Sequence, residues 1–392
     1  MDSLTHLAAG ALVPLAFRNA PKRAGLVLFG IAAGEFPDAD VFFGHSPEAA
    51  MTIHRGFTHS LLVQPVSALI LALAFFFLLT RTGRGGEGLP RQRQGWQESL
   101  DGFGFRGLFL AGLLALYLHV YLDCMTSFGT RIFLPFSPVR VGLPAMFIID
   151  ILCTLPALWL LWIALRRRNA PQDGSPKEAS GDQARFFSGQ TRRCARLGLA
   201  WLFFYPLACL AVNAGTTLYL ESALAGTEDP AASQKEAAPQ HAGTLHLLPE
   251  PFSPFVWKVL ADDGDSYRMG IFDLSAGTSF LPFSRFDKPK PGLWDSLEKQ
   301  DAFFAAFREF SPFLIARINR ADERETEYAF MDLRYVVAEY SPLRLLWGRT
   351  KTVFVLEARV SAEGRLLAYR FLRDSTRQET PWTLPDGTAA RS

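Results

Sequence analysis

The chain has 392 residues and a formal net charge of +2, which excludes the strong basic excess typical of nucleic-acid-binding proteins, so no nucleic-acid partner is expected. Hydrophobic residues make up 49% of the sequence and concentrate before about residue 220, whereas the remainder has the composition of a soluble domain. Four cysteines occur without a CxxC pair, which argues against a disulfide framework and against a thiolate metal site.

Two short apolar runs begin the chain, at residues 4–17 and 24–34, with a basic turn between them. Neither is long enough to cross a bilayer comfortably, so together they predict a helical hairpin that dips into the membrane or packs within a bundle. Further apolar stretches predict membrane-spanning helices over residues 61–79, 107–123, 144–165 and 197–220.

Lysine and arginine concentrate in three connecting segments, at residues 18–23, 81–106 and 166–196. The positive-inside rule places these segments in the cytoplasm. Counting the predicted spans between them puts the histidine and aspartate motifs on the opposite, external side of the membrane. The C-terminal part of the chain falls on that external side as well.

These features predict a multi-span α-helical membrane domain followed by a small extracytoplasmic α+β domain. In chain order, the predicted parts are a helical membrane domain with the polar motifs (1–165), a cytoplasmic basic loop (166–196), a last transmembrane helix (197–220), a linker (221–243) and the α+β domain (244–380). Residue patterns in the last part predict strands near 255–260, 267–274, 328–339, 350–359 and 366–372, and one or two helices over 294–320.

The segment between the first hairpin and the first long span carries carboxylate and imidazole side chains: Glu35, Asp38, Asp40, His54 and His59. Anionic oxygens and imidazole nitrogens held close together are the ligands of a metal site, although a polar loop would have the same composition. Asp38 and Asp40 alternate, so in an extended chain they would share a side, with one binding the metal and the other orienting a histidine.

A second pair of candidate ligands, His119 and Asp123, lies four residues apart on a predicted helix, and therefore on one face. His6, near the start of the chain, is expected on the same side of the membrane. A metal site is favoured because ionisable groups next to a membrane span are costly and tend to be functional. The alternative is a hydrogen-bonded histidine–aspartate pair that closes the end of a helix.

Two further residues are candidates for catalytic roles, each with a structural alternative. Glu35 could act as a general base or simply be a charge at the end of a helix. Arg55, followed by Gly56, is expected in a turn, where it could be structural or could bind an anionic group such as phosphate.

Four motifs occur in order within roughly residues 1–165: Asp2-x-x-Thr5-His6, Pro37-Asp38-x-Asp40, His54-Arg55-Gly56-x-Thr58-His59-Ser60 and His119-x-x-x-Asp123. Each is weak alone, but the ordered combination resembles the YdjM family of bacterial inner-membrane proteins. That family is described as LexA-regulated, membrane-bound, metal-dependent hydrolases. The resemblance implies a multi-pass protein of the bacterial inner membrane that binds a divalent metal.

The order of the motifs is also distantly similar to zinc-dependent phospholipase C and P1 nuclease, which are helical phosphodiesterases with a zinc cluster. Carried over, this similarity implies one metal held by Asp40, His54, His119 and Asp123, and a second held by His6 and Asp123. The sequence departs from that group because no histidine occurs between His119 and His241, so the later ligands of a three-zinc site are missing. His59, Asp38 or Asp150 would have to compensate.

The leading hypothesis is a metal-dependent hydrolase, with zinc as the favoured metal, that acts on a phosphoester or a membrane lipid at the outer face of the inner membrane. A non-catalytic membrane protein is the alternative, with a structural metal or hydrogen-bond cluster and an external domain that binds a partner. A transporter is disfavoured because the candidate ligands gather at one face and do not line a path across the bilayer.

Overall fold

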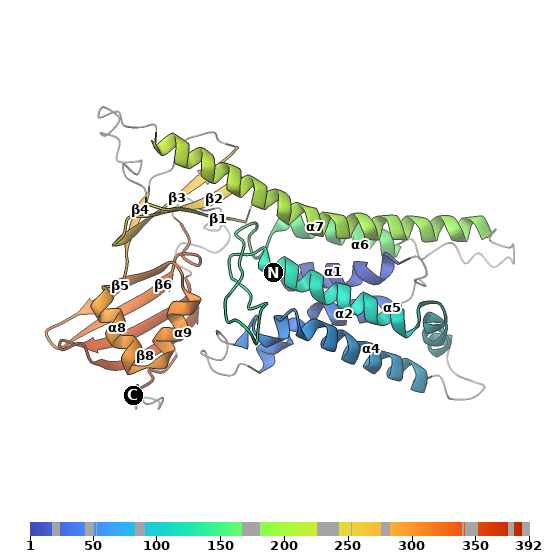
Figure 1. Cartoon of the computed structure of the whole chain (residues 1–392), viewed down its shortest axis with the longest axis horizontal. Coiled ribbons are helices and arrows are strands. Elements are labelled where there is room, and N and C mark those ends of the chain that lie inside the picture. The colour runs from blue at the N-terminus through green and yellow to red at the C-terminus, as the bar shows by residue number, and fades with distance from the viewer. Residues whose placement is uncertain are drawn as a thin grey trace. The chain divides into compact units, whose positions relative to one another are not determined.

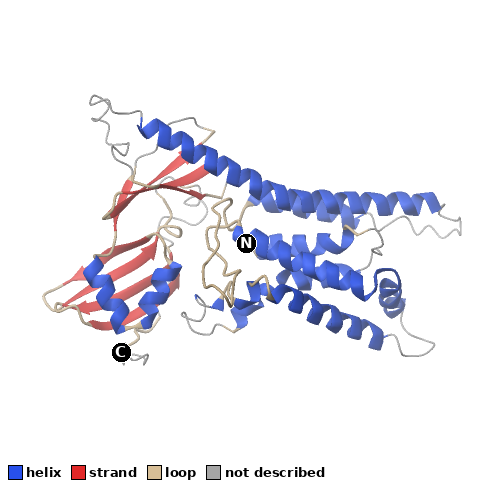
Figure 2. Ribbon diagram, viewed as in Figure 1, coloured by secondary structure: helices blue, strands red, loops and turns tan. Residues whose placement is uncertain are grey.

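The computed structural model describes residues 1–17, 24–43, 51, 53–82, 91–166, 181–225, 243–251, 253–275, 283–338, 341, 352–374 and 380–385. The chain divides into two compact units: Met1–Phe42 with Arg55–Leu210, and Phe43–His54 with Ala211–Ser392. The first unit is helical, and the strands all lie in the second (Figures 1 and 2). The predicted order, a helical half followed by an α+β half, is therefore present.

The helices of the first part are α1 (Ser3–Leu15), α2 (Ala24–Glu35), α4 (Val63–Thr82), α5 (Arg91–Cys124), α6 (Ile151–Arg166) and α7 (Gly181–Ala225), with the short 3-10 helices η1 (Pro37–Phe42) and η2 (Phe57–His59). One of them begins earlier than predicted, since α7 starts at Gly181, inside a segment expected to be a loop. In α5, a helical stretch from Arg91 is separated from the predicted helix by a break at Gly104, where φ is 63° and ψ is 174°. Apolar composition identifies only the part of a helix that can be buried, and a helix can continue through polar residues beyond it.

Two described helices are long and apolar enough to cross a membrane: Phe103–Cys124 and Gly189–Ala223. Four further apolar helices, at Ser3–Leu15, Ala24–Glu35, Val63–Leu78 and Ile151–Leu165, are shorter than the roughly 20 residues that a full crossing requires. The multi-span topology and the side on which the second unit lies remain predictions.

Glycines allow α1 and α2 to pack in close contact. A Cβ atom on Gly10 would lie 2.2 Å from the carbonyl oxygen of Gly30, and a Cβ on Gly34 would lie 2.8 Å from the carbonyl oxygen of His6. Only residues without a side chain permit this approach, which is a common way for helices to associate in membranes. The packing fixes the end of α2, where Gly34 and Glu35 lie, beside His6 on α1.

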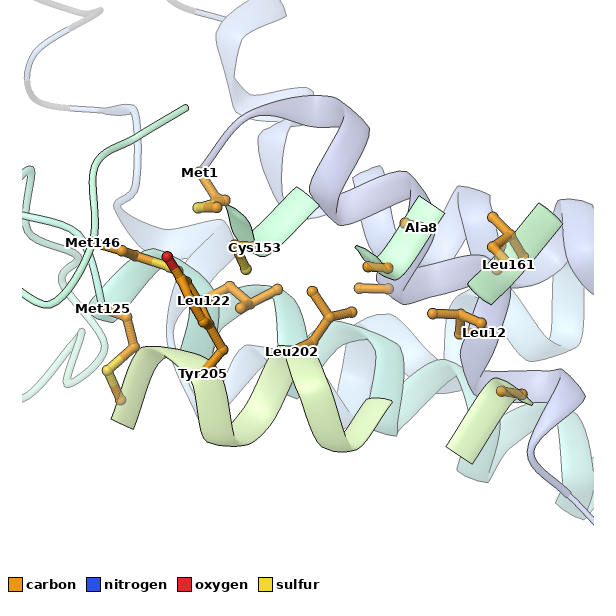
Figure 3. Packing of buried hydrophobic residues seen from close by; sticks show 14 of the residues in the cluster. Met1, Ala8, Leu12, Leu122, Met125, Met146, Cys153, Leu161, Leu202 and Tyr205 are labelled. Atoms are coloured by element: carbon orange, nitrogen blue, oxygen red, sulfur yellow. The ribbon is translucent and has the colours of Figure 1, made fainter. Parts of the chain in front are cut away.

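The main core of the first unit forms where α1, α5, α6 and α7 meet (Figure 3). Buried side chains in this cluster include Leu12, Leu122, Cys153 and Leu202. Residues 125–150, predicted in part as the start of a span, instead form a connector held by bridges such as Thr130 to Val141. Consequently α6 begins only at Ile151.

The second unit contains two four-stranded antiparallel sheets with consecutive strand order. The strands of the first sheet are β1 (Leu245–Pro249), β2 (Val256–Asp262), β3 (Ser266–Asp273) and β4 (Ser284–Asp287). The strands of the second sheet are β5 (Leu314–Ala321), β6 (Glu325–Asp332), β7 (Val353–Ser361) and β8 (Leu366–Asp374). Helices α8 (Pro291–Gln300) and α9 (Ala302–Phe310) bury aromatic rings against the second sheet, with Trp294 4.9 Å from the ring of Phe330.

The predicted helical segment 294–320 differs from the structure in its last third, because β5 begins at Leu314. Leu314 and Ile315 are buried whereas residues 317–321 are exposed, so the local pattern resembles neither a regular helix nor a regular strand. Pairing with β6 along the whole strand decides the outcome. The short strands β1 and β4 also lie outside the predicted set.

Candidate metal centre

Four side chains with metal-binding atoms converge near the C-terminal end of α5. Asp38 comes from η1, His59 from η2, and His119 and Asp123 from α5. One nitrogen or oxygen atom from each lies within 4.8 Å of all the others. His59, His119 and Asp123 are buried, whereas Asp38 keeps 22% of its side chain exposed. We call these four residues the His/Asp cluster.

Five of the six separations within the His/Asp cluster match those of a tetrahedral metal site. His59 Nε2 lies 3.2 Å from His119 Nε2 and 3.2 Å from Asp123 Oδ2. Asp38 Oδ1 lies 3.3 Å from His59 Nε2 and 3.6 Å from His119 Nε2. His119 Nε2 lies 3.4 Å from Asp123 Oδ2. Ligand atoms placed tetrahedrally at about 2.0–2.1 Å from zinc are about 3.3–3.4 Å apart, so these five distances suit a single ion.

Both imidazoles are oriented by partners of the other ring nitrogen. His119 Nδ1 lies 2.6 Å from the carbonyl oxygen of Gly34, which can only accept, so Nδ1 carries a hydrogen. His59 Nδ1 lies 3.0 Å from Thr58 Oγ1 and 3.4 Å from Asp40 Oδ2. Each arrangement turns Nε2 toward the cluster, as metal ligation requires.

Asp38 and Asp40 do not lie in an extended segment, yet a carboxylate oxygen of each lies within 4.8 Å of a carboxylate oxygen of the other. They lie in the 3-10 helix η1, where three residues make a turn. Asp38 belongs to the His/Asp cluster, while Asp40 Oδ2 accepts hydrogen bonds from the Arg55 backbone N–H at 3.0 Å and from Thr58 Oγ1 at 2.9 Å. Asp40 therefore holds the segment that carries His59.

Two buried carboxylate oxygens of the cluster accept no hydrogen bond from the described residues: Asp38 Oδ1 and Asp123 Oδ2. They are the same oxygens that approach His59 Nε2 at 3.3 and 3.2 Å, without the geometry of a hydrogen bond. Leaving such oxygens unpaired in a buried site is costly, and one cation would satisfy both. The residues present therefore fit a divalent metal ion, and the two-nitrogen, two-oxygen set suits zinc.

Carboxylates outnumber cationic groups around the cluster. Asp38, Asp40 and Asp123 are accompanied by the guanidinium of Arg55 and the amino group of Met1, both of which contact Asp123 Oδ1. Burial opposes a charge on His59, yet the three neighbouring carboxylates raise its pKa to about 10. A proton on His59 thus compensates the carboxylates when no other cation does, and a metal ion would replace that proton on binding.

Arg55 is buried and holds Asp123 in place. Its Nη2 lies 2.8 Å from Asp123 Oδ1, and its Nη1 donates to Thr126 Oγ1 at 3.0 Å. The guanidinium carbon lies 4.7 Å from the ring centroid of Phe128. The backbone of Arg55 has a left-handed φ of 57°, as a tight turn before Gly56 requires. Of the two roles predicted for Arg55, these contacts favour the structural one.

His6 lies against the cluster without being one of the four members. Its ring stacks on that of His119 with centroids 3.7 Å apart, and its Nε2 lies 3.3 Å from Asp123 Oδ1. Within the described ranges, neither ring nitrogen of His6 has a hydrogen-bond partner. His54, in contrast, belongs to the second compact unit, so its role as a ligand remains a prediction. Within the first unit, the structure brings Asp38 together with His59.

Glu35 ends α2, directly after the Gly34 carbonyl that orients His119. Burial raises the pKa of Glu35 to about 7, and its Oε1 has no hydrogen-bond partner in the described part of the chain. A carboxyl group with this pKa can exchange a proton near neutral pH. Asp150 is not a member of the His/Asp cluster. Its Oδ1 accepts hydrogen bonds from the Cys153 backbone N–H at 2.9 Å and from the Tyr205 hydroxyl at 3.0 Å.

Sequence reasoning overlooked the residues that position the ligands. The Gly34 carbonyl offers no side-chain signal, and only the close packing of α1 and α2 brings it to His119. Thr126, which binds Arg55, comes from the connector after α5 and has no motif around it. Thr58 could have been recognised, because a hydroxyl next to a candidate histidine ligand can orient that ring.

A family model described as YdjM inner membrane protein matches residues 1–216 of the chain, which is more than half of its length. The match contains every member of the His/Asp cluster together with His6, Glu35 and Arg55. No curated protein matches the sequence, and no solved structure matches it either.

Proposed function

The chain belongs to the YdjM inner membrane protein family, and we propose that it binds a divalent metal through the His/Asp cluster and hydrolyses an ester at the membrane surface. One observation carries this proposal: Asp38, His59, His119 and Asp123 bring four ligand atoms within 4.8 Å of one another, with five of the six separations between 3.2 and 3.6 Å. Two of these atoms are buried oxygens that lack a donor among the described residues. Zinc is the metal that this mixture of imidazole and carboxylate favours.

A divalent ion at this position supplies Lewis acidity, which activates water and polarises a phosphoryl or acyl oxygen. The residues of the chain supply orientation and proton transfer. Asp38 is the exposed edge of the cluster, and substrate would approach from its side. Glu35, with a pKa near 7, is the candidate general base. Arg55 is a positioning residue, because its guanidinium is committed to Asp123 and Thr126.

The proposed substrate is a phosphoester or a membrane lipid, presented at the outer face of the inner membrane. The cluster lies at the C-terminal end of the apolar helix Phe103–Cys124, so it would sit near the membrane surface. The positive-inside rule, applied to the basic segments 81–106 and 166–196, puts that end of the helix outside. The same reasoning makes the second unit extracytoplasmic.

A structural metal is the second candidate, and a specific observation favours it. The chain would supply four ligand atoms to one ion, a number typical of structural zinc sites, whereas catalytic sites use three and keep one position open. The exposed fraction of Asp38 and the proton-exchanging Glu35 favour catalysis instead. Metal content alone cannot separate the two roles, so two measurements are needed.

The first measurement is elemental mass spectrometry on the full chain purified in detergent and reloaded with zinc. We expect about one ion per chain in the wild type and a loss of more than tenfold in Asp123→Asn, because a ligand is removed. Asp150→Asn is the matched control, since Asp150 is equally buried but lies outside the cluster. If the wild type takes up no metal, or if both variants lose it equally, the metal centre is refuted.

The second measurement compares hydrolysis of phosphodiester and phospholipid substrates by the metal-loaded wild type and Glu35→Gln. A hydrolase should lose activity in Glu35→Gln while keeping its metal. Metal without activity on any substrate, combined with a lower unfolding temperature after chelation, would assign the ion a structural role and overturn the hydrolase proposal.

A further inference from the structure

A groove of about 770 Å³ lies on the first unit between α1, α5 and α7, apart from the His/Asp cluster. Its walls are almost wholly apolar, with Leu114 and Leu118 from α5, Leu199 and Phe203 from α7, and Phe17 after α1. Leu114 and Phe203 are about half exposed, so the groove opens to the surroundings of the helices. Its volume falls within the range of about 300–1,000 Å³ typical of small-molecule sites.

The two long walls of the groove run parallel with matching spacing. Leu114 and Tyr121 are seven residues apart on α5, as are Arg196 and Phe203 on α7, so each wall covers about two helical turns, or roughly 10 Å. The two walls meet where the Tyr121 ring stacks on Phe203 with centroids 5.1 Å apart and its hydroxyl donates to the Phe203 carbonyl at 2.6 Å. The long axis therefore leads toward Arg196.

Arg196 is the charged group in the lining of this groove. Its Nε donates to the carbonyl oxygen of Ala16 at 3.2 Å, which holds the side chain at the groove while the rest of the guanidinium remains able to donate. No carboxylate pairs with Arg196 in the described part of the chain. An apolar channel that ends at an arginine is complementary to an acyl chain joined to an anionic headgroup.

The groove and the His/Asp cluster lie on opposite faces of α5. Tyr117 and Tyr121 line the groove, whereas His119 and Asp123 belong to the cluster. These pairs are offset by two residues, which corresponds to about 200° around a helix. A molecule bound in the groove therefore does not reach the cluster. The ligand of the groove is thus distinct from a substrate of the cluster.

We propose that this groove binds one acyl chain of an anionic phospholipid, with the phosphate held by Arg196. The bilayer supplies such a molecule, because the chain belongs to a family of inner membrane proteins and the groove is built from its apolar helices. Arg192 and Arg193 precede Arg196 on the same helix and increase the attraction for an anionic headgroup. The site holds the headgroup of the lipid at the Arg196 end of the groove, independently of any hydrolytic reaction.

The test is native mass spectrometry of the delipidated full chain, titrated with phosphatidylglycerol or phosphatidylcholine in detergent. We expect one phosphatidylglycerol to bind more tightly than phosphatidylcholine, and Arg196→Gln to weaken phosphatidylglycerol about fivefold to tenfold and phosphatidylcholine less, because the choline cation offsets the charge of its phosphate. Arg193→Gln is the matched control, because it removes the same charge one turn away without lining the groove. Equal effects of the two variants would show nonspecific attraction and overturn the proposal.

A second variant tests the apolar part of the groove. Ala200→Trp places a bulky side chain in the lining and should abolish binding of both lipids, while the unfolding temperature and metal content stay at wild-type values. Unchanged lipid binding in Ala200→Trp would overturn the acyl-chain site. A change of oligomeric mass in place of lipid loss would show that a second copy occupies the groove, which also overturns the proposal. Complete displacement of both lipids by inorganic phosphate would show an anion site without an acyl-chain site and would overturn the proposal.

Discussion

Each compact unit buries a cluster of charged side chains, but the two clusters are balanced differently. In the second unit, Lys258 lies 3.5 Å from Glu250 Oε1 and donates to three backbone carbonyl groups, while Ser341 donates to Glu250. One cation faces one anion: Glu250 Oε1 also lacks a hydrogen-bond donor among the described residues, but it faces the Lys258 ammonium group. In the first unit, the three aspartates exceed Arg55 and the Met1 amino group, so that a proton on His59 or a metal ion is needed for balance, and oxygens of Asp38 and Asp123 lack donors among the described residues.

The comparison shows that burial of charge by itself does not identify a functional site. The Lys258–Glu250 pair joins the first sheet to the segment after β6, because the carbonyl groups that Lys258 contacts belong to Leu333, Arg334 and Val336. The His/Asp cluster has an unbalanced charge and converging acceptors instead, which stabilise a protein only when a cation is present. An excess of acceptors at one point is therefore the feature that indicates a ligand.

The largest expected effect separates the two histidines of the same motif. His59→Ala should reduce bound metal more than tenfold, since its Nε2 is part of the His/Asp cluster, whereas His54→Ala should have a smaller effect, because His54 is not one of the four members of that cluster. Elemental mass spectrometry on both variants measures this. The opposite pattern would favour the pairing of Asp40 with His54 that the distant phospholipase resemblance implies.

The next largest effect concerns the balanced cluster of the second unit. Lys258→Met should lower the free energy of unfolding by about 3–5 kcal/mol, because it leaves the Glu250 carboxylate buried without its cation. This loss is measured by denaturant unfolding, with proteolysis of the second unit as the readout. The double variant Lys258→Met with Glu250→Gln should recover most of the stability. Metal content should be unchanged in both variants, and a loss of metal would contradict the separation of the two clusters.

A smaller effect is expected for Asp40, which contacts the His/Asp cluster without being one of its four members. Asp40→Asn should weaken metal binding about 10- to 100-fold, because Asp40 contacts His59 Nδ1 and holds the turn at Arg55. Titration against a competing chromogenic chelator measures the affinity. Asp287→Asn makes the same chemical change on an exposed strand and should have no effect. A complete loss of metal in Asp40→Asn would make Asp40 a direct ligand instead.

The smallest effect is a pH dependence of stability caused by Glu35. Burial raises its pKa from 4.5 to about 7 in the folded protein, so the folded state binds the proton more tightly than the unfolded state. Stability contributed by this group is therefore present below about pH 4.5 and is lost as the pH rises toward 7. Unfolding temperatures of the wild type and Glu35→Gln, measured across this range, should converge at low pH. Parallel curves would show that Glu35 does not titrate there.

Several features could be predicted from the sequence because they depend on local periodicity. His119 and Asp123 share a helix face through their four-residue spacing, and both contribute to the cluster. The apolar stretches located the helices of the first unit, and the turn at residues 262–265 joins β2 to β3 as the alternation on either side indicates. In each case, neighbouring residues carry the information.

The choice between candidates of the same kind was decided by tertiary structure. Asp38 and Asp40 are equivalent in sequence, and only the 3-10 geometry of η1 turns Asp38 to the cluster and Asp40 to the Arg55 backbone. His119 is oriented by the Gly34 carbonyl, which reaches it because glycines let α1 and α2 pack closely. The sequence therefore determined which chemistry is available, whereas packing between distant segments decided which atoms meet, because a ligand set depends on distances in space.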